Sequence, residues 1–224
     1  MGGNKIGVLG GIGPEASAEF YNKLINKLQE SNLIKTNKDY PQIIINSIPA
    51  QELIFDKIKE KDLEFYKKGL KELDSLKPDF IIMVCNTIHL YYDILQKEIS
   101  TPILDLRKLV KEYLEENKIK SVLIIGTPNT IKQGLYKFKE IKTFEPNKKE
   151  LKQLTNAIFN YNKGIEKNLQ SKVVKEICNK YIQKGAQFIL LGCTEFALML
   201  EKENLPKIST IDILVESTIK KSFK

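Results

Sequence analysis

Short apolar runs alternate along the chain with longer segments in which apolar residues recur at helical spacing. Most of the runs lack the strict alternation of apolar and polar residues that marks a half-exposed strand. Strands of that kind are buried on both faces, as in a parallel sheet covered by helices. The runs predict strands at residues 5–9, 42–47, 80–84, 103–104, 121–125, 143–144, 188–191 and 209–211. The segments between them predict helices that include residues 16–29, 51–73, 148–169 and 171–183.

One pattern occurs twice in the chain. Each copy opens with an apolar run that enters a glycine turn, at residues 5–14 and again at 120–128. In each copy a later apolar run ends in a cysteine, Cys85 or Cys193, followed by small polar residues and a helical pattern. Each copy closes with a short apolar stretch that ends in an aspartate, Asp105 or Asp212. The separation between equivalent residues of the two copies, such as Cys85 and Cys193, is too long for the repeat of a solenoid. It indicates a duplicated domain.

The predicted fold class is therefore α/β, with two similar domains related by pseudo-twofold symmetry. Each domain is expected to hold a small parallel sheet flanked by helices, because strands alternate with helices in right-handed βαβ units. We expect residues 1–106 and 211–224 to form the first domain, with the last helix returning to it. Residues 107–210 are expected to form the second domain.

The unusual polar residues of both copies follow the carboxyl ends of predicted strands. Ligands of open α/β sheets bind beyond these strand ends. Two thiols that face one another across a cleft suit a reaction that is the same in both directions, such as racemisation. Cys85 and Cys193 could then act in turn as thiolate base and thiol acid. Asn86, Thr87, Thr194 and nearby backbone amides would hold the substrate carboxylate.

A single cysteine at a strand end is more often a small buried apolar residue than a catalyst. The symmetric pair, with polar neighbours on both sides, favours catalysis for Cys85 and Cys193. Cys178 differs, because it lies at helical apolar spacing, and we predict that it packs in the core. The only histidine, His89, follows Cys85 by four residues. It lacks further ligands for a metal site, so no metal is expected, and we predict a local hydrogen bond.

The net charge of +8 could indicate a polyanion partner. The positive charges are almost all lysines interleaved with Glu and Asp, as on a solvated helix surface. Arg107 is the only arginine, whereas readers of nucleic acid rely on arginine forks. We therefore expect no nucleic-acid partner.

Three cysteines, no signal peptide and no apolar stretch of membrane-spanning length are seen in the sequence. An odd number of cysteines argues against a disulfide scaffold and for reduced thiols. We expect a cytoplasmic protein that does not contact a membrane.

Residues 11–16 match the dinucleotide fingerprint G-x-G-x-x-A between a strand and a helix. The next predicted strand ends in Asn46 and Ser47, without the acidic residue that a ribose needs, and Pro14 removes an amide donor. A tight glycine turn that lets a substrate or the partner domain approach Gly11 fits the segment better.

Four segments of the chain, residues 6–17, 84–89, 125–130 and 191–195, resemble the aspartate/glutamate racemase family, and within it the aspartate racemase branch. Glutamate racemases tend to open with Asp-Ser-Gly and to carry Gly-Cys-Thr-His. Gly10, Gly11 and Glu195 stand at those positions here. The resemblance extends over nearly the whole chain.

The resemblance implies a two-base mechanism without cofactor or pyridoxal phosphate, with Cys85 and Cys193 as the acid/base pair, in a homodimer. It implies substrate contacts by Asn86, Thr87 and Ile88, and by Lys163 at a substrate carboxylate. It leaves open whether His89 and Glu195 tune the thiols. The full set of expected substrate-binding residues is Gly11, Gln51, Asn86, Thr87, Ile88, Thr127, Lys163 and Thr194.

One departure concerns specificity. Many members carry Ile-Pro-Asp-Arg where this chain has Ile-Pro-Ala-Gln at residues 48–51. Gln51 cannot reproduce the charged fork of an arginine at a carboxylate. The leading hypothesis is an amino-acid racemase, most of all an aspartate racemase. Its alternatives are a related glutamate racemase, hydantoin racemase or maleate isomerase, and more remotely a non-catalytic dinucleotide-binding protein.

Overall fold

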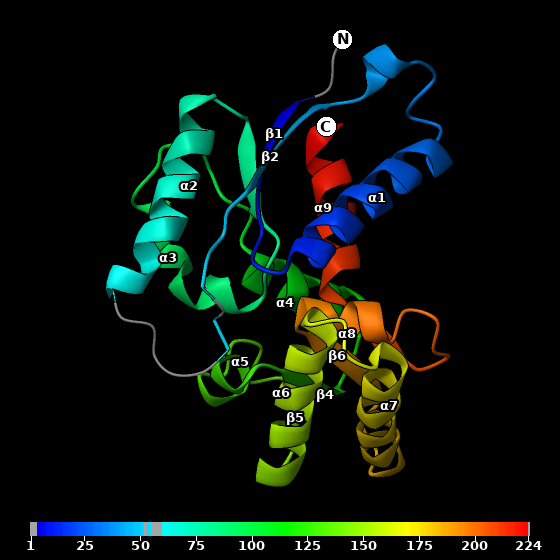
Figure 1. Ribbon diagram of the computed structural model, residues 1–224. Helices are drawn as coiled ribbons and strands as arrows, with labels where there is room; N and C mark the ends of the chain where they lie inside the picture. Colours follow the sequence, from blue (N-terminus) through cyan, green and yellow to red (C-terminus); the bar gives the residue numbers. More distant parts are fainter. Residues whose placement is uncertain (1–3, 52, 55–59, 224) are drawn as a thin grey trace. The chain divides into compact units, whose positions relative to one another are not determined.

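The computed structural model describes residues 4–51, 53, 54 and 60–223. In it the chain forms two compact units, each built on one parallel sheet (Figure 1). Among the described residues, unit 1 comprises 4–51, 60–105 and 211–223. Unit 2 comprises 53, 54 and 106–210.

Unit 1 contains a three-stranded sheet in the order β2-β1-β3, and all of its pairings are parallel. A single parallel bridge joins Ile81 of β3 to Ile103, beyond the sheet's third strand. The strands are β1 (Lys5–Gly10), β2 (Gln42–Ser47) and β3 (Phe80–Met83). The helices are α1 (Pro14–Glu30), η1 (Asn37–Asp39), η2 (Glu60–Leu63), α2 (Glu64–Ser75), η3 (Thr87–Tyr91), α3 (Tyr92–Gln96) and α9 (Thr210–Ser222).

Unit 2 contains a four-stranded parallel sheet in the order β5-β4-β6-β7. Its strands are β4 (Ser121–Gly126), β5 (Lys142–Phe144), β6 (Phe188–Gly192) and β7 (Lys207–Ser209). Its helices are α4 (Leu106–Glu116), α5 (Pro128–Lys132), α6 (Lys148–Asn162), α7 (Lys167–Gln183) and α8 (Thr194–Met199).

The two sheets share one connectivity. In each, the first strand in the chain lies between the second and the third, and the next extended segment lies beside the third. The segment around Ile103 in unit 1 thus corresponds to β7 in unit 2. The prediction of an α/β fold with two small parallel sheets flanked by helices is confirmed.

The central strands form the core of each unit. Every residue of β3 and β4 is buried, as are Ile6, Val8 and Leu9 of β1. Burial of each large aliphatic side chain contributes about 1.5–3 kcal/mol. Strand β2 lies at the edge of its sheet and is only partly covered. The unbroken apolar runs thus mark strands that pack on both faces.

Helix α9 belongs to unit 1, where it lies beside α1 (Figure 1). The Nζ of Lys23 on α1 donates to Oδ1 of Asp212 on α9 at 2.8 Å. Asp212 therefore does not follow a strand end, as the repeat had suggested, but lies in the first turn of a helix. The strand predicted at 209–211 was wrong in its last two residues for the same reason, because β7 ends at Ser209.

Three predicted helices were wrong in extent. Helix α2 begins only at Glu64, after η2, and Gln51, Leu53 and Ile54 are not helical. Residues 52 and 55–59 of the same prediction lie outside the described residues. The predicted helix at 148–169 ends at Asn162, and α7 starts at Lys167 rather than at the predicted residue 171. The chain turns between α6 and α7 through Gly164 and Glu166, both with positive φ.

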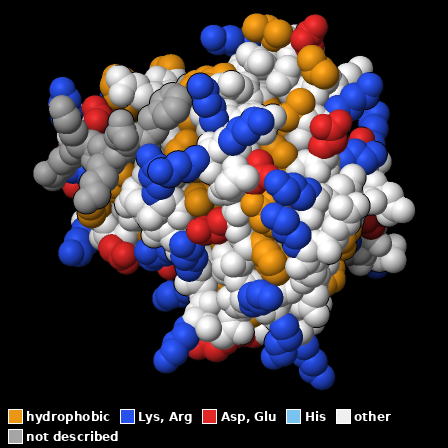
Figure 2. Space-filling model, turned by 90° about the horizontal axis from the view of Figure 1, so that it is seen from below, with side chains coloured by type: hydrophobic (Ala, Val, Ile, Leu, Met, Phe, Trp, Pro, Cys, Tyr) orange, Lys and Arg blue, Asp and Glu red, His pale blue; other side chains and the backbone are white. Residues whose placement is uncertain are grey.

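The basic side chains are dispersed on the surface. Figure 2 shows Lys and Arg side chains on one face with acidic and apolar side chains between them. Several lysines are engaged in ion pairs, among them Lys111 with Glu115 and Lys137 with Glu145. This distribution supports the interpretation of the positive charge as a solvated surface. Among the described residues, no helix is both long and apolar enough to cross a membrane.

The turn after β1 depends on glycine. Gly11 has φ +83°, and a Cβ placed on it would lie 2.3 Å from the carbonyl oxygen of Ile48. The chain after β2 passes this close because the Ile48 N–H donates to the carbonyl of Gly10 at 3.1 Å. The glycine of the dinucleotide-like pattern is thus required for contact with the protein's own backbone.

Replacement of Gly11 by alanine should therefore destabilise the protein by about 2–4 kcal/mol, since strain and a clash with backbone add together. Gly164→Ala is the matched control, because Gly164 has φ +73° but a Cβ added to it would meet no atom within 4 Å. We expect it to cost about 1 kcal/mol from strain alone. Free energies of unfolding from urea denaturation provide the comparison, and equal losses in both variants would contradict it.

Candidate active site

In unit 1, the pairing of β1 with β3 brings the predicted site residues to one edge of the sheet. Leu9 is paired with Met83, and the Val84 N–H donates to the carbonyl of Leu9 at 3.0 Å. Gly11 and Cys85 therefore leave neighbouring strands at the same carboxyl edge. This is the edge at which open α/β sheets bind ligands.

Cys85 lies between the end of β3 and the 3-10 helix η3. Its side chain is buried but retains 9% exposure, whereas Asn86 and Thr87 are 2% exposed. Ile88 is completely buried, so its side chain belongs to the core of unit 1. A substrate contact by Ile88 would have to use its backbone. The Cys-Asn-Thr segment is thus almost entirely buried, and Cys85 is the most exposed of its three residues.

Gln51 lies near the same edge. The chain reaches it from β2 through Ile48, which is bonded to Gly10 at the end of β1. The hydroxyl of Tyr66 on α2 donates to the backbone carbonyl of Gln51, and the Gln51 side chain is exposed. Unit 1 therefore brings together Gly11, Gln51 and the Cys85 segment.

Tyr66 was not predicted as a site residue, because its helical apolar spacing makes it look like ordinary core. Its side chain is fully buried, yet its hydroxyl fixes the segment that carries Gln51. Burial, with smaller contributions from the charges of Cys85 and Asp62, raises the pKa of Tyr66. Tyr66 therefore stays a neutral donor near the first thiol.

In unit 2, β4 and β6 end together in the pair Gly126 and Gly192. Thr127 follows β4 and caps α5, since its Oγ1 accepts from the Thr130 N–H at 3.1 Å. Cys193 follows β6 as the residue that precedes α8, and it is 6% exposed. Thr127, Cys193 and Thr194 therefore lie at one edge of the sheet of unit 2.

A carboxylate lies beside the second thiol. Cys193 Sγ donates to Glu195 Oε2 at 2.8 Å, and Thr194 Oγ1 donates to the same oxygen at 3.1 Å. The Nδ2 of Asn162, the last residue of α6, donates to Glu195 Oε1 at 3.4 Å. Asn162 was not predicted, because only the fold brings the end of α6 to this edge.

Lys163 directly follows Asn162 at the end of α6, and its side chain is exposed. Its position beside Asn162 places it at the same end of unit 2 as Cys193. Thr127 and the Cys193 segment therefore lie at the carboxyl edge of the sheet of unit 2, and Lys163 lies at the same end of that unit.

The remaining candidates have structural roles. His89 is fully buried, and its Nε2 lies 3.4 Å from the carbonyl oxygen of Met83. Cys178 is fully buried on α7, and burial raises the pKa of its thiol to about 12. The core prediction for Cys178 and the local hydrogen bond predicted for His89 are confirmed. Within the described ranges, no three His, Cys, Asp or Glu side chains are grouped as metal ligands.

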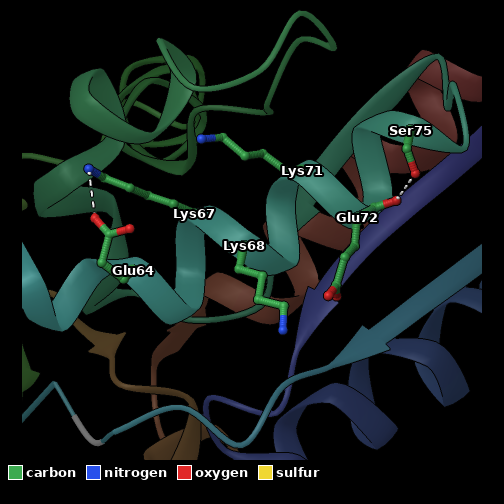
Figure 3. Close-up of a pocket in the computed structure, with 6 residues that line it drawn as sticks. All are labelled: Glu64, Lys67, Lys68, Lys71, Glu72 and Ser75. Carbon is green, nitrogen blue, oxygen red and sulfur yellow. Dashed lines mark hydrogen bonds and ion pairs between the residues drawn. The ribbon is translucent and has the colours of Figure 1, made fainter.

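A shallow hollow on α2 shares no residue with these edges (Figure 3). Lys67 and Lys71 extend from one side of the helix, and both form ion pairs with Glu98, at 3.2 and 2.8 Å. These pairs tie α2 to the segment that follows α3. The hollow is a cluster of structural ion pairs, lined by Glu64, Lys67, Lys68, Lys71, Glu72 and Ser75.

A buried carboxylate, Glu150, joins α6 to α7 and so supports the helix that carries Asn162 and Lys163. It accepts from the Asn147 N–H at 2.9 Å, from the Tyr181 hydroxyl at 2.7 Å and from Lys180. Burial by itself would raise the pKa of Glu150. The hydrogen bonds from Lys180, Asn147 and Tyr181 outweigh burial and lower this pKa to about 2.

Glu150→Gln should destabilise the protein at pH 7 by roughly 1–3 kcal/mol, because a charged network loses its acceptor. The folded pKa of about 2 lies below the ordinary value of 4.5. The stabilisation from the ionised carboxylate is therefore complete above about pH 4.5 and disappears as the pH falls toward 2. Urea denaturation at several pH values should show the wild type and the variant converging over this range.

The control is Glu116→Gln, which removes an exposed carboxylate from α4. It should change the unfolding free energy by less than about 0.5 kcal/mol at any pH. A constant difference between the wild type and Glu150→Gln down to pH 2 would contradict the assignment.

The fold is that of known racemases. The structure matches Picrophilus torridus aspartate racemase with a TM-score of 0.77, at 25% identity, over 97% of this chain and 94% of that one. It matches an aspartate racemase homologue from Pyrococcus horikoshii with a TM-score of 0.75, at 25% identity, over 99% and 100% of the two chains. The protein therefore has the racemase fold.

Comparison of the sequence with known protein families shows the family to which the chain belongs. The pattern that describes Asp/Glu/hydantoin racemases matches residues 9–218. The chain belongs to the Asp/Glu/hydantoin racemase family. It is also similar to the broad specificity amino-acid racemase RacX of Bacillus subtilis, with 26% identity over 96% of each chain.

Proposed function

We propose that this protein is a cofactor-independent amino-acid racemase that uses Cys85 and Cys193 as its two acid/base groups. The observation that carries the proposal is the equivalent position of the two cysteines. Each follows the third strand of its unit, at the carboxyl edge, and each keeps a slight exposure that the core residue Cys178 lacks.

In this mechanism the thiolate of one cysteine removes the α-proton of the amino acid, and the C–H electron pair stays on the substrate as a carbanion. The thiol of the other cysteine donates its proton to the opposite face of that carbon and becomes the thiolate. The two sulfur atoms thereby exchange protonation states, and proton exchange with water returns the free enzyme to its starting form before the next turnover in the same direction. Both steps are general acid–base catalysis.

The substrate carboxylate needs donors, because negative charge develops on it as the proton leaves. We propose that Asn86, Thr87 and the Ile88 backbone supply donors from unit 1. Thr127, Lys163 and Thr194 would act from unit 2, and Gly11 would let the substrate approach the backbone closely.

Aspartate or a related amino acid is the proposed substrate. Support comes from the aspartate racemase of Picrophilus torridus and from the broad specificity racemase RacX, to which the chain is similar. The exposed Gln51 is the expected contact for the substrate side chain. A neutral amide there discriminates less strongly for a carboxylate than an arginine does.

Other enzymes of this kind, glutamate and hydantoin racemases and maleate isomerases, are alternatives that keep the same pair of cysteines. The dinucleotide alternative is weaker, because the backbone of Ile48 occupies the space beside Gly11. The amide of Asn46, near the end of β2, is also engaged by Glu72 and the Gly69 carbonyl.

Replacing either cysteine, as Cys85→Ala or Cys193→Ala, should lower the rate of racemisation by at least about 10²–10⁴-fold, since each removes one acid/base group. The rate is measured as the appearance of the D-enantiomer from L-aspartate, L-glutamate and other L-amino acids by chiral chromatography. Cys178→Ala is the matched control, and the folded variant should retain the activity of the wild type. Substantial turnover in either site variant would contradict the two-thiol mechanism.

Gln51→Arg should increase kcat/KM for aspartate relative to alanine by roughly tenfold, because a charge-assisted fork replaces a neutral hydrogen bond. Gln51→Met, of similar length but without hydrogen-bonding groups, is the control and should not favour aspartate. If the ratio of kcat/KM for aspartate to that for alanine is unchanged in Gln51→Arg, the substrate side chain does not contact residue 51.

Two further features are proposed with this function. A homodimer is expected from the family resemblance, and sedimentation equilibrium would measure it. The cytoplasm is the expected location, because Cys85, Cys178 and Cys193 form no disulfide and the mechanism requires reduced thiols.

A further inference from the structure

The carboxylate of Glu195 is a feature that the two-thiol mechanism does not use. Three donors converge on it within unit 2: the Cys193 thiol at 2.8 Å, the Thr194 hydroxyl at 3.1 Å and the Asn162 amide at 3.4 Å. The residue is buried, with 8% exposure. The Cys193 thiol and the Thr194 hydroxyl share the same oxygen, Oε2. The carboxylate is therefore held in place with its charge beside the sulfur atom.

In unit 2, β6, α6 and α7 pack against α8. Strand β6 carries no charged side chain. Helix α7 carries the charged residues Lys167, Lys172, Lys175, Glu176 and Lys180. Lys167 lies over the ring of Tyr161, and Lys175 and Lys180 are paired with Glu203 and Glu150. At the end of α6 the neutral Asn162 donates to Glu195, and the exposed Lys163 follows it.

An acceptor that is negatively charged stabilises the protonated form of its donor. If Cys193 lost its proton, two negative charges would lie at hydrogen-bond distance, which disfavours the thiolate. A thiolate formed there would in turn be a stronger base than an isolated one. The three donors to Glu195 are neutral groups, so their hydrogen bonds fix the carboxylate without cancelling its charge.

We propose that Glu195 is a positioning residue that keeps Cys193 as a protonated thiol in the resting enzyme. This assignment concerns the state of the thiol, and only its consequence for turnover rests on the proposed racemase function. The resting enzyme would hold Cys193 as the acid and would first accept the enantiomer whose α-proton Cys85 removes. In that step the Cys193 proton passes to the α-carbon and its electron pair remains on sulfur.

The test measures each thiol separately in the full-length protein without substrate. Wild type and Glu195→Gln are treated with iodoacetamide over a range of pH, and the alkylation rate of each cysteine is followed by peptide mass spectrometry. We expect the pH of half-maximal alkylation of Cys193 to fall by about 1 unit or more in the variant, because an opposing charge is removed. The Cys85 midpoint should move much less.

The matched control is Glu176→Gln, which removes an exposed carboxylate from α7 and should leave the Cys193 midpoint unchanged. Cys178, which is fully buried, reports folding, because its alkylation requires the core to open. If Glu195→Gln fails to fold, Glu195→Asp withdraws the carboxylate by one methylene and should shift the midpoint in the same direction by a smaller amount.

A Cys193 midpoint in Glu195→Gln equal to that of Glu176→Gln, or one shifted upward, would overturn the proposal. The readout needs no turnover, so it remains decisive even for a protein that racemises no tested amino acid. A downward shift without racemisation would support the assignment of Glu195 and refute the proposed function instead.

Discussion

The parallel pairing of the first and third strands in each unit is the constraint on which the candidate site depends. In unit 1 it aligns Leu9 with Met83, and in unit 2 it aligns Gly126 with Gly192. Because parallel strands end at the same edge, a glycine turn and a cysteine leave the sheet together in each unit. The helices that follow are fixed by capping, by buried side chains and by the Glu150 network. The chemistry is thus a consequence of strand register.

The two edges are built alike but surrounded by different groups. Cys85 is followed by buried Asn86 and Thr87, and Tyr66 holds the neighbouring segment in place. Cys193 instead donates to Glu195, which the end of α6 also contacts. A duplicated fold has thus acquired different neighbours for its two thiols. Such asymmetry is compatible with a reversible reaction, because the equilibrium constant between enantiomers depends on the substrate and not on the catalyst.

The sequence predicted the sheets and the cysteine positions well, because buried parallel strands lack polar alternation and the repeat marks both strand ends. The predicted helix bounds were wrong where apolar residues of the helical pattern are exposed or belong to the other unit. Ile165 and Leu169 extend the helical pattern beyond α6 although both are about half exposed, at 47% and 49%. Leu53 belongs to unit 2 and not to α2. Asn162 could not be predicted, because it reaches the site from a helix remote in sequence from the segment it contacts. Tyr66 could not be predicted, because its apolar helical spacing is that of an ordinary core residue.

The central claim is that two different groups transfer the proton, and deuterium incorporation in D₂O tests it most directly. Early in the reaction of an L-amino acid, without added cofactor, the D-product and the remaining L-substrate are separated and analysed by mass spectrometry. Two bases predict deuterium at the α-carbon of the product and almost none in the recovered substrate, because the proton is removed by one thiol and replaced from the other. Equal labelling of both enantiomers would show a single base and contradict the account.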